Sequence, residues 1–183
     1  VYKFTFRYTS HVFFQNIDDI DFFTSRQIIP YHKAVLLPGS GLDTSYFKPS
    51  FFKRNRNYKF TFLFLGRFLF DKGLQEYINA AKIVIKLYPR TDFIMLGSHD
   101  ESNPANYPCH LLKSQTSDKF FKVINHQHDV RPFIEGCDCF VLPSYREGLS
   151  RALLEASSMA KPVITSDVPG CSCLLYTSPS PRD

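Results

Sequence analysis

Short apolar runs that alternate with amphipathic helical segments constrain the fold of this 183-residue chain more than any other feature. The runs that we expect to form strands are residues 59–65, 91–96, 121–124, 139–142 and 162–165. Between the first two runs, apolar side chains recur at the spacing of a buried helix face. That face consists of Leu74, Tyr77, Ile78, Ala81 and Ile85. Strands that alternate with helices predict an α/β fold with a parallel sheet and right-handed crossovers.

Two more helices are expected after the third strand. Asp129 is a candidate N-cap for a short helix that ends at Glu135. A second helix follows the strand at 139–142 and contains Glu155. Residues 98–119 are polar, include two prolines and give the weakest signal in the chain.

The first 50 residues indicate the end of a preceding domain. We expect helices at 2–8 and 18–24 and strands at 11–15 and 34–37. The segment from Pro38 to Gly41, with Asp43, is expected to form a turn, and residues 47–57 to form a polar linker. The predicted organisation is therefore a domain remnant with its linker at 1–50 and a second domain at 58–171.

Residues 173–183 look foreign to the domain. The run from Cys173 to Asp183 resembles the translation of a sequencing adapter, so we expect a non-native tail that is not part of the fold. The chain also opens at Val1 rather than at a methionine. We expect that both ends of the parent protein are missing from this fragment.

Positive charge is concentrated in the first third of the chain. The net charge is +5, and the excess falls within residues 1–60. The densest basic run, Lys53, Arg54 and Arg56, lies beside two phenylalanines. A solvated linker is the simpler interpretation of this run, and contact with an anionic membrane surface or a phosphorylated acceptor is the alternative. Because no recognition motif accompanies the charge, we expect no nucleic-acid partner.

The cysteines argue against a zinc site or a disulfide framework. None outside the tail shows Cys-x-x-Cys spacing. Cys137 and Cys139 are expected on one face of a strand, as buried and reduced thiols. No apolar run reaches the roughly 18 residues of a membrane span. The sequence predicts a cytoplasmic protein, with peripheral contact at the inner face of the membrane as a further expectation.

Two glutamates mark a candidate ligand site where an apolar strand turns into an amphipathic helix. Glu147 follows the strand at 139–142, and Glu155 lies in the helix whose apolar stripe is Leu149, Ala152, Leu153 and Ala156. Sheets of this class bind ligands at the carboxyl ends of their strands. If most of the interval is helical, the carboxylates lie roughly 12 Å apart along the axis, with free N–H groups between them. A nucleotide diphosphate sugar, with hydroxyls at both ends of a diphosphate, suits this arrangement.

Three motifs support a more specific assignment. They are Gly66-Arg67 with Lys72-Gly73, Asp129-Val-Arg-Pro132, and Glu147-Gly-Leu-Ser-Arg-Ala-Leu-Leu-Glu155 followed by residues 161–170. Together they resemble the retaining glycosyltransferases of family four, over roughly residues 12–171. The resemblance is greatest to bacterial enzymes that add an N-acetylhexosamine to polyprenyl-diphosphate-linked sugars or to surface polysaccharides. It implies a GT-B architecture, with the donor-binding half nearly complete and a remnant of the acceptor-side, Rossmann-like domain.

The resemblance also implies a role for each site residue. Arg67 and Lys72 would contact the donor diphosphate and stabilise the charge that develops there without a metal. Glu147 would lie near the donor sugar. The remaining donor-binding set is Glu155 at the ribose hydroxyls, Gly148, Leu149 and Ser150 through backbone N–H groups, and Gly66, Gly41, Gly39 and Ser40 in loops that face the cleft.

A metal site is not expected. His126 and His128 share one strand-to-helix connection without a third ligand nearby, so loop histidines are favoured over metal ligands. We expect no cofactor apart from a nucleotide-sugar donor, which the resemblance implies to be UDP-linked. The chain departs from the family at Ser150, Ala160 and Asn125, where proline or glycine is usual. These departures remove no charged group and affect local backbone geometry.

The parent protein is expected to transfer a UDP-hexose or UDP-N-acetylhexosamine sugar to a lipid-linked or polysaccharide acceptor with retention. The fragment itself is expected to be inactive. One alternative is a nucleotide-sugar-binding module without transfer. Another is a different enzyme of the same architecture, such as an epimerase or a phosphorylase, against which the glutamate spacing argues.

Overall fold

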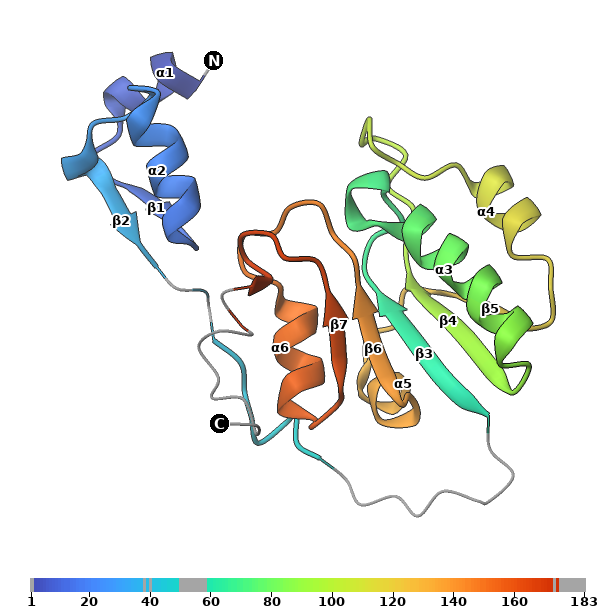
Figure 1. Cartoon of the computed structure of the whole chain (residues 1–183). Coiled ribbons are helices and arrows are strands. Elements are labelled where there is room, and N and C mark those ends of the chain that lie inside the picture. Colours follow the sequence, from blue (N-terminus) through green and yellow to red (C-terminus); the bar gives the residue numbers. More distant parts are fainter. Residues whose placement is uncertain (1, 38, 40, 50–58, 173, 175–183) are drawn as a thin grey trace. The chain divides into compact units, whose positions relative to one another are not determined.

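A computed structural model of the chain describes residues 2–37, 39, 41–49, 59–172 and 174. The chain divides into two compact units, and each contains a parallel sheet (Figure 1). The first unit comprises Val1–Gly41, Arg146–Ser150 and Asp167–Asp183, and the second comprises Leu42–Tyr145 and Arg151–Ser166. The predicted domain boundary between 50 and 58 and the predicted tail at 173–183 fall, except for residue 174, outside the described residues.

The second unit is built on a five-stranded parallel sheet. Its strands are β3 (Phe60–Leu65), β4 (Thr91–Gly97), β5 (Phe121–Asn125), β6 (Cys139–Leu142) and β7 (Val163–Thr165). They lie side by side in the order β5-β4-β3-β6-β7, as Figure 1 shows. All five predicted strands and the parallel sheet are confirmed.

Helices connect these strands on both faces of the sheet. They are α3 (Leu74–Leu87), α4 (Cys109–Gln115), α5 (Arg131–Gly136) and α6 (Arg151–Ser158), with a short 3-10 helix, η3, at Phe70–Lys72. The strand order runs one way from β3 to β5 and the other way from β6 to β7. Right-handed crossovers therefore place α3 and α4 on one face and α5 and α6 on the other. The reversal between β3 and β6 is a topological switch point, where sheets of this kind bind ligands.

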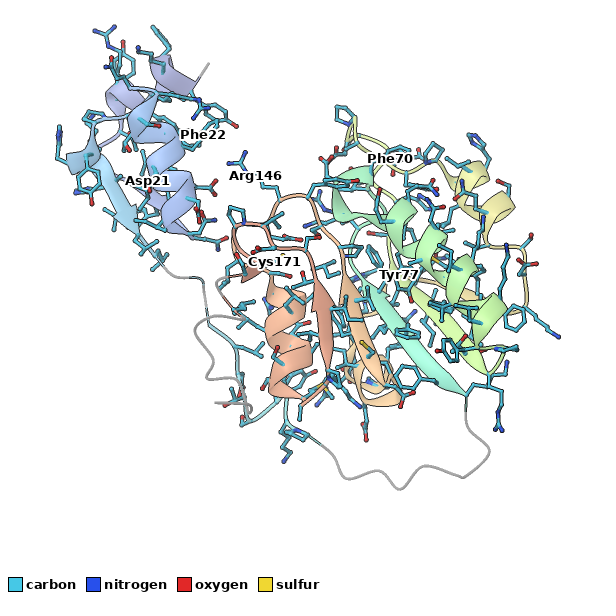
Figure 2. The ribbon with its side chains drawn as sticks, viewed as in Figure 1. Asp21, Phe22, Phe70, Tyr77, Arg146 and Cys171 are labelled. Carbon is cyan, nitrogen blue, oxygen red and sulfur yellow. The ribbon has the colours of Figure 1, made fainter. Side chains whose placement is uncertain are left out.

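The apolar face of α3 packs on the sheet as its spacing predicted. Leu74, Ile78 and Ala81 are fully buried. Tyr77, labelled in Figure 2, is also buried, and its hydroxyl oxygen lies 3.0 Å from the carbonyl oxygen of Phe62 and 3.1 Å from that of Ile94. Burial raises the pKa of Tyr77 well above its ordinary value. Helix α3 is therefore fixed to both β3 and β4.

Two local predictions were wrong, and one helix was missed. The N-cap of α5 is Val130 and not Asp129, because Asp129 sits one residue too early and its carboxylate accepts instead from the Arg131 N–H at 3.0 Å. Helix α6 begins at Arg151, so Leu149 precedes it and the stretch from Glu147 to Ser150 is not helical. Helix α4 lies in the polar region that gave the weakest signal.

Two details of β6 and α6 refine the predictions. Cys137 and Cys139 are both buried and free, but Cys137 caps α5, so only Cys139 lies in β6. Ala160 has a φ of 55°, in the left-handed region that favours glycine after a helix. The usual glycine at this position in the family therefore has a conformational reason.

The start of the linker is anchored by the Asp129-Val-Arg-Pro132 motif. The Arg131 guanidinium lies 3.7 Å from the centre of the Tyr46 ring and donates to both carboxylate oxygens of Asp129, at 2.9 and 2.7 Å. The Ser158 hydroxyl donates to the Phe47 carbonyl. These contacts hold Tyr46 and Phe47 within the second unit. The basic run at residues 53–56 lies outside the described residues.

The first unit has a smaller core. It contains α1 (Tyr2–Thr5), a 3-10 helix η1 (Phe6–Tyr8), β1 (Val12–Phe14), α2 (Ile17–Ser25), a 3-10 helix η2 (Tyr31–Lys33) and β2 (Ala34–Leu36). Strands β1 and β2 are parallel, and Phe14, Ile20 and Ile29 form the buried cluster. The predicted helices and strands of this region are confirmed. In the part of the chain that the structure describes, no helix has the length and apolar character needed to cross a membrane.

Candidate functional site

The loop after β3 presents two cations at the carboxyl edge of the sheet. Phe68 and Leu69 are buried, and the Phe68 N–H donates to the Ser98 carbonyl at 2.8 Å. These contacts fix the middle of the loop, and Arg67 and Lys72 lie on either side of it. The loop after β3 therefore has a defined backbone between its two basic residues.

Arg67 is paired with a carboxylate that follows the neighbouring strand β4. Its guanidinium lies 2.9 Å from Asp100, and 54% of the Arg67 side chain is exposed. A hydrogen bond from Ser102, and the hydrogen bond and charge of Arg67, hold the pKa of Asp100 below its ordinary value. An exposed ion pair contributes little to stability, because water and salt screen its charges. Arg67 can therefore exchange Asp100 for another anion at small cost.

The loops after β3 and β6 pack against each other at the switch point. The Tyr145 N–H donates to the Asp71 carbonyl at 2.9 Å, and the Tyr145 hydroxyl donates to Glu76 at 2.7 Å. Gly73 has a φ of +71°, and a Cβ there would lie 2.6 Å from the carbonyl carbon of Pro143. Only glycine fits this turn without moving β6 or α3. Lys72 is thus held by a turn that packs directly against the end of β6.

Glu155 is the buried charge of the second unit. Only 11% of its side chain is exposed, and its carboxylate accepts from the Arg151 Nε at 3.1 Å. Burial raises the pKa of Glu155 above its ordinary value of 4.5, while the hydrogen bond and charge of Arg151 oppose that shift. The expected boundary position of Glu155 agrees with this burial. A carboxylate that has lost water in this way favours ligand hydroxyls as replacement donors.

Replacing Glu155 with glutamine is expected to stabilise the protein at neutral pH. The pKa of Glu155 is higher in the folded protein than in the unfolded protein. Its contribution to stability is therefore fully present below the unfolded-state pKa and is lost as the pH rises through the folded-state pKa. Glutamine removes the ionised form and retains an acceptor for Arg151. We expect Glu155→Gln to melt at a higher temperature than the original protein at pH 7 and at the same temperature at pH 4.

Thermal melts followed by circular dichroism at both pH values measure this difference. Glu101→Gln, at an exposed position, is the matched control and should show no difference at either pH. An equal melting temperature for Glu155→Gln and the original protein at pH 7 would show that ionisation of Glu155 carries no cost.

Glu147 belongs to a loop in the first unit. Arg146, immediately before it, forms an ion pair with Asp19, and Figure 2 shows the Arg146 side chain reaching towards α2. On the other side of Glu147, the Leu149 N–H donates to the Gln15 side chain at 3.2 Å, and the Ser150 N–H donates to the Gly170 carbonyl at 3.3 Å. Two of the three backbone N–H groups expected to hold phosphate therefore already have protein partners.

The predicted site residues fall into two groups, one in each unit. The second unit contains Gly66, Arg67, Lys72 and Glu155. The first unit contains Gly39, Gly41, Glu147, Gly148, Leu149 and Ser150, while Ser40 lies outside the described residues. The ligand contacts assigned to these residues remain predictions.

Sequence reasoning missed three residues that hold the predicted ones. Asp100 pairs with Arg67, and Gln15 and Asn16 contact the Glu147 loop. Each follows a strand by a few residues, at the carboxyl edge where loops of a parallel sheet converge. Their position just after a strand is the sequence feature that could have identified them.

The two loop histidines do not extend into a larger cluster. The ring centres of His126 and His128 lie 5.7 Å apart. Among the residues that the structure describes, no group of three or more His, Cys, Asp or Glu side chains is placed to hold a metal ion. The expectation of a metal-free site stays a prediction.

The sequence is similar to bacterial glycan-assembly proteins. A family model described as "Glycosyl transferases group 1" matches residues 47–175. N,N'-diacetylbacillosaminyl-diphospho-undecaprenol alpha-1,3-N-acetylgalactosaminyltransferase of Campylobacter jejuni is 27% identical over 93% of this chain and 46% of its own length. UDP-Gal:alpha-D-GlcNAc-diphosphoundecaprenol alpha-1,3-galactosyltransferase of Escherichia coli is 29% identical over 78% of this chain and 39% of its own. The chain spans less than half the length of these relatives.

Solved structures with the same fold include Anabaena Alr3699/HepE in complex with UDP-glucose. That structure superposes with a TM-score of 0.73 at 18% identity, over 92% of this chain and 48% of the other. The C-terminal domain of the group 1 family protein LpcC from Francisella tularensis has a TM-score of 0.57 at 26% identity, over 68% of this chain and 70% of that domain.

Proposed function

This chain belongs to the group 1 glycosyltransferases, and we propose that the protein containing it transfers a sugar from a nucleotide sugar to an acceptor with retention of configuration. The predicted family is confirmed, as is the α/β, Rossmann-like sheet that matches the C-terminal half of GT-B glycosyltransferases. The fragment alone is proposed to be inactive, because it spans less than half the length of the relatives that it matches.

The observation that carries this proposal is the anchored loop after β3. It holds Arg67 and Lys72 at the carboxyl edge of the sheet, beside the switch point. When a sugar leaves a nucleotide sugar, negative charge develops on the diphosphate. Preorganised cations stabilise that charge most when their backbone does not need to move. In the proposed mechanism, the two cations bind the diphosphate and need no metal or other cofactor.

The donor is proposed to be a UDP-hexose or a UDP-N-acetylhexosamine. The E. coli relative is named for UDP-Gal, and Alr3699/HepE was solved with UDP-glucose. In this chain, the buried Glu155 carboxylate would accept hydrogen bonds from the ribose hydroxyls. Glu147 would do the same for hydroxyls of the donor sugar.

The acceptor is proposed to be lipid-linked or an oligosaccharide. Both curated relatives carry diphosphoundecaprenol acceptors in their names. An acceptor anchored in a bilayer requires the protein to work at the membrane surface. We therefore propose a cytoplasmic protein that makes peripheral contact with the inner face of the membrane.

A nucleotide-sugar-binding module without transfer is the second candidate. The contact between the Leu149 N–H and Gln15 favours it, because that donor is engaged by the protein instead of being open to phosphate. If this candidate is correct, the protein binds UDP but forms no glycosylated product from a UDP-sugar and an acceptor.

Calorimetric titration of the full-length protein with UDP, together with a transfer assay, tests the proposal. We expect UDP to bind, and Glu155→Gln to weaken it about tenfold, or ~1.4 kcal/mol. Glu101→Gln serves as the control. With a UDP-sugar and a polyprenyl-diphosphate-linked acceptor, NMR should show a product with the donor's anomeric configuration. Binding without product would favour the module, and a folded protein that fails to bind UDP would contradict both candidates.

A further inference from the structure

Two consecutive residues at the end of β1 hold two consecutive residues of the Glu147 loop. The Asn16 side-chain amide donates to the Gly148 carbonyl at 2.9 Å. The Gln15 side-chain oxygen accepts from the Leu149 N–H at 3.2 Å. One side chain therefore acts as a donor and the other as an acceptor on adjacent backbone groups.

Asn16 is buried, with 5% of its surface exposed, and both ends of its amide are used. Its oxygen accepts from the Asp19 N–H at 2.7 Å and so caps α2. Its nitrogen contacts the Gly148 carbonyl and also lies 3.1 Å from the Asp19 carboxylate. The capping bond thereby fixes the direction in which the amide points to the loop.

Gly148 allows the close approach of Gln15. A Cβ at position 148 would overlap the side-chain oxygen of Gln15 and lie 3.4 Å from its Cδ. A larger residue would displace the end of the Gln15 side chain, and that displacement would lengthen or break its hydrogen bond with the Leu149 N–H. The glycine has a packing role here, distinct from the phosphate contact that the family resemblance implies.

The loop is restrained before Glu147 as well as after it. Arg146 pairs with Asp19, and its guanidinium carbon lies 5.5 Å from the centre of the Phe22 ring. Asp19 itself is bound to Asn16. A single polar network on the first turn of α2 therefore reaches both sides of Glu147.

We propose that Gln15 and Asn16 are positioning residues that orient Glu147 towards the sugar of the nucleotide-sugar donor. The proposal rests on the donor-sugar role of Glu147 given under the proposed function. Displacement of a catalytic group by about 1 Å can lower a rate roughly a hundredfold. Residues that fix the backbone on both sides of Glu147 therefore control kcat more than they control nucleotide affinity.

Asn16→Ser separates the positioning role from helix capping. Serine is as good an N-cap as asparagine, so α2 should keep its stability. Serine is too short to cap α2 and also reach the Gly148 carbonyl. In the full-length protein, we expect an unchanged melting temperature, faster hydrogen exchange at residues 146–150 and about tenfold lower kcat, with little change in the KM for the donor. Asn79→Ser, at an exposed position on α3, is the matched control.

Gln15 offers a conservative pair of variants. Gln15→Leu removes the acceptor for the Leu149 N–H and should speed its hydrogen exchange. Gln15→Glu keeps an acceptor oxygen at the same reach and should restore slow exchange. If both variants exchange at the rate of the original protein, the contact with Leu149 does not hold the loop.

A double-mutant cycle with Glu147→Gln shows whether Asn16 acts through Glu147. If it does, Asn16→Ser combined with Glu147→Gln has the kcat of Glu147→Gln alone. If the losses in kcat of the two single variants multiply in the double variant, Asn16 does not act through Glu147 and the positioning role is overturned. If hydrogen exchange at residues 146–150 is unchanged in Asn16→Ser, the Asn16 contact does not hold the loop. An unchanged kcat in Glu147→Gln alone would instead refute the proposed role of Glu147, so the two failures are distinguishable.

Discussion

Lys72→Met is expected to lower kcat for sugar transfer by about a hundredfold or more, which corresponds to ~2.7 kcal/mol of transition-state stabilisation. Methionine keeps a long, flexible side chain and removes the charge. The turn formed by η3 and Gly73 holds the backbone of Lys72 against the end of β6. The leaving diphosphate would then lose a cation at the point where its charge increases most.

Single-turnover transfer by the full-length protein, at saturating donor, measures this loss directly. Lys86→Met is the matched control, because Lys86 lies exposed in the last turn of α3. Lys72→Arg keeps the charge and should fall between the original protein and Lys72→Met. A kcat within about twofold of the original for Lys72→Met would exclude Lys72 from the transition state.

Gly73→Ala is expected to destabilise the second unit by about 2–5 kcal/mol, since the left-handed backbone of a non-glycine residue and the overlap with a neighbour both add to the cost. The φ of Gly73 is +71°, and a Cβ there would meet the backbone of Pro143. Backbone atoms cannot swing away as a flexible side chain can. Either the turn after η3 or the end of β6 must shift, and both carry the candidate site.

Urea denaturation followed by circular dichroism gives the change in the free energy of unfolding. Gly41→Ala separates strain from overlap, because Gly41 has a φ of +70° and, among the described residues, no atom lies within 4 Å of an added Cβ. Gly136→Ala, which has neither feature, should be nearly neutral. If Gly73→Ala costs no more than Gly41→Ala, the contact with Pro143 is loose enough to accept a methyl group.

The sheet could be predicted from the sequence because its strands carry their own signal. Strands buried on both faces read as continuous apolar runs, and β3, β4 and β6 each do so. The 3.6-residue period of α3 fixed which side of that helix would be buried. These features depend on neighbours within about ten residues in the chain.

The missed features depend on partners that are distant in the chain. Asp100 follows β4, while its partner Arg67 follows β3, and only the pairing of those strands brings them together. Gln15 and Leu149 are separated by still more of the chain. Side-chain contacts of this kind have no local pattern. Helix α4 was missed for a different reason, because its short sequence lies among prolines and polar residues.

The burial of Glu155 has a consequence for protein engineering. A stability-guided redesign that considers only the unliganded protein would select this position early, since a neutral or apolar residue there removes a desolvated charge. Such a redesign would gain thermal resistance and discard the group proposed to read the ribose. If Glu155 binds the ribose as proposed, the carboxylate at this position trades stability of the unliganded protein for recognition of the donor.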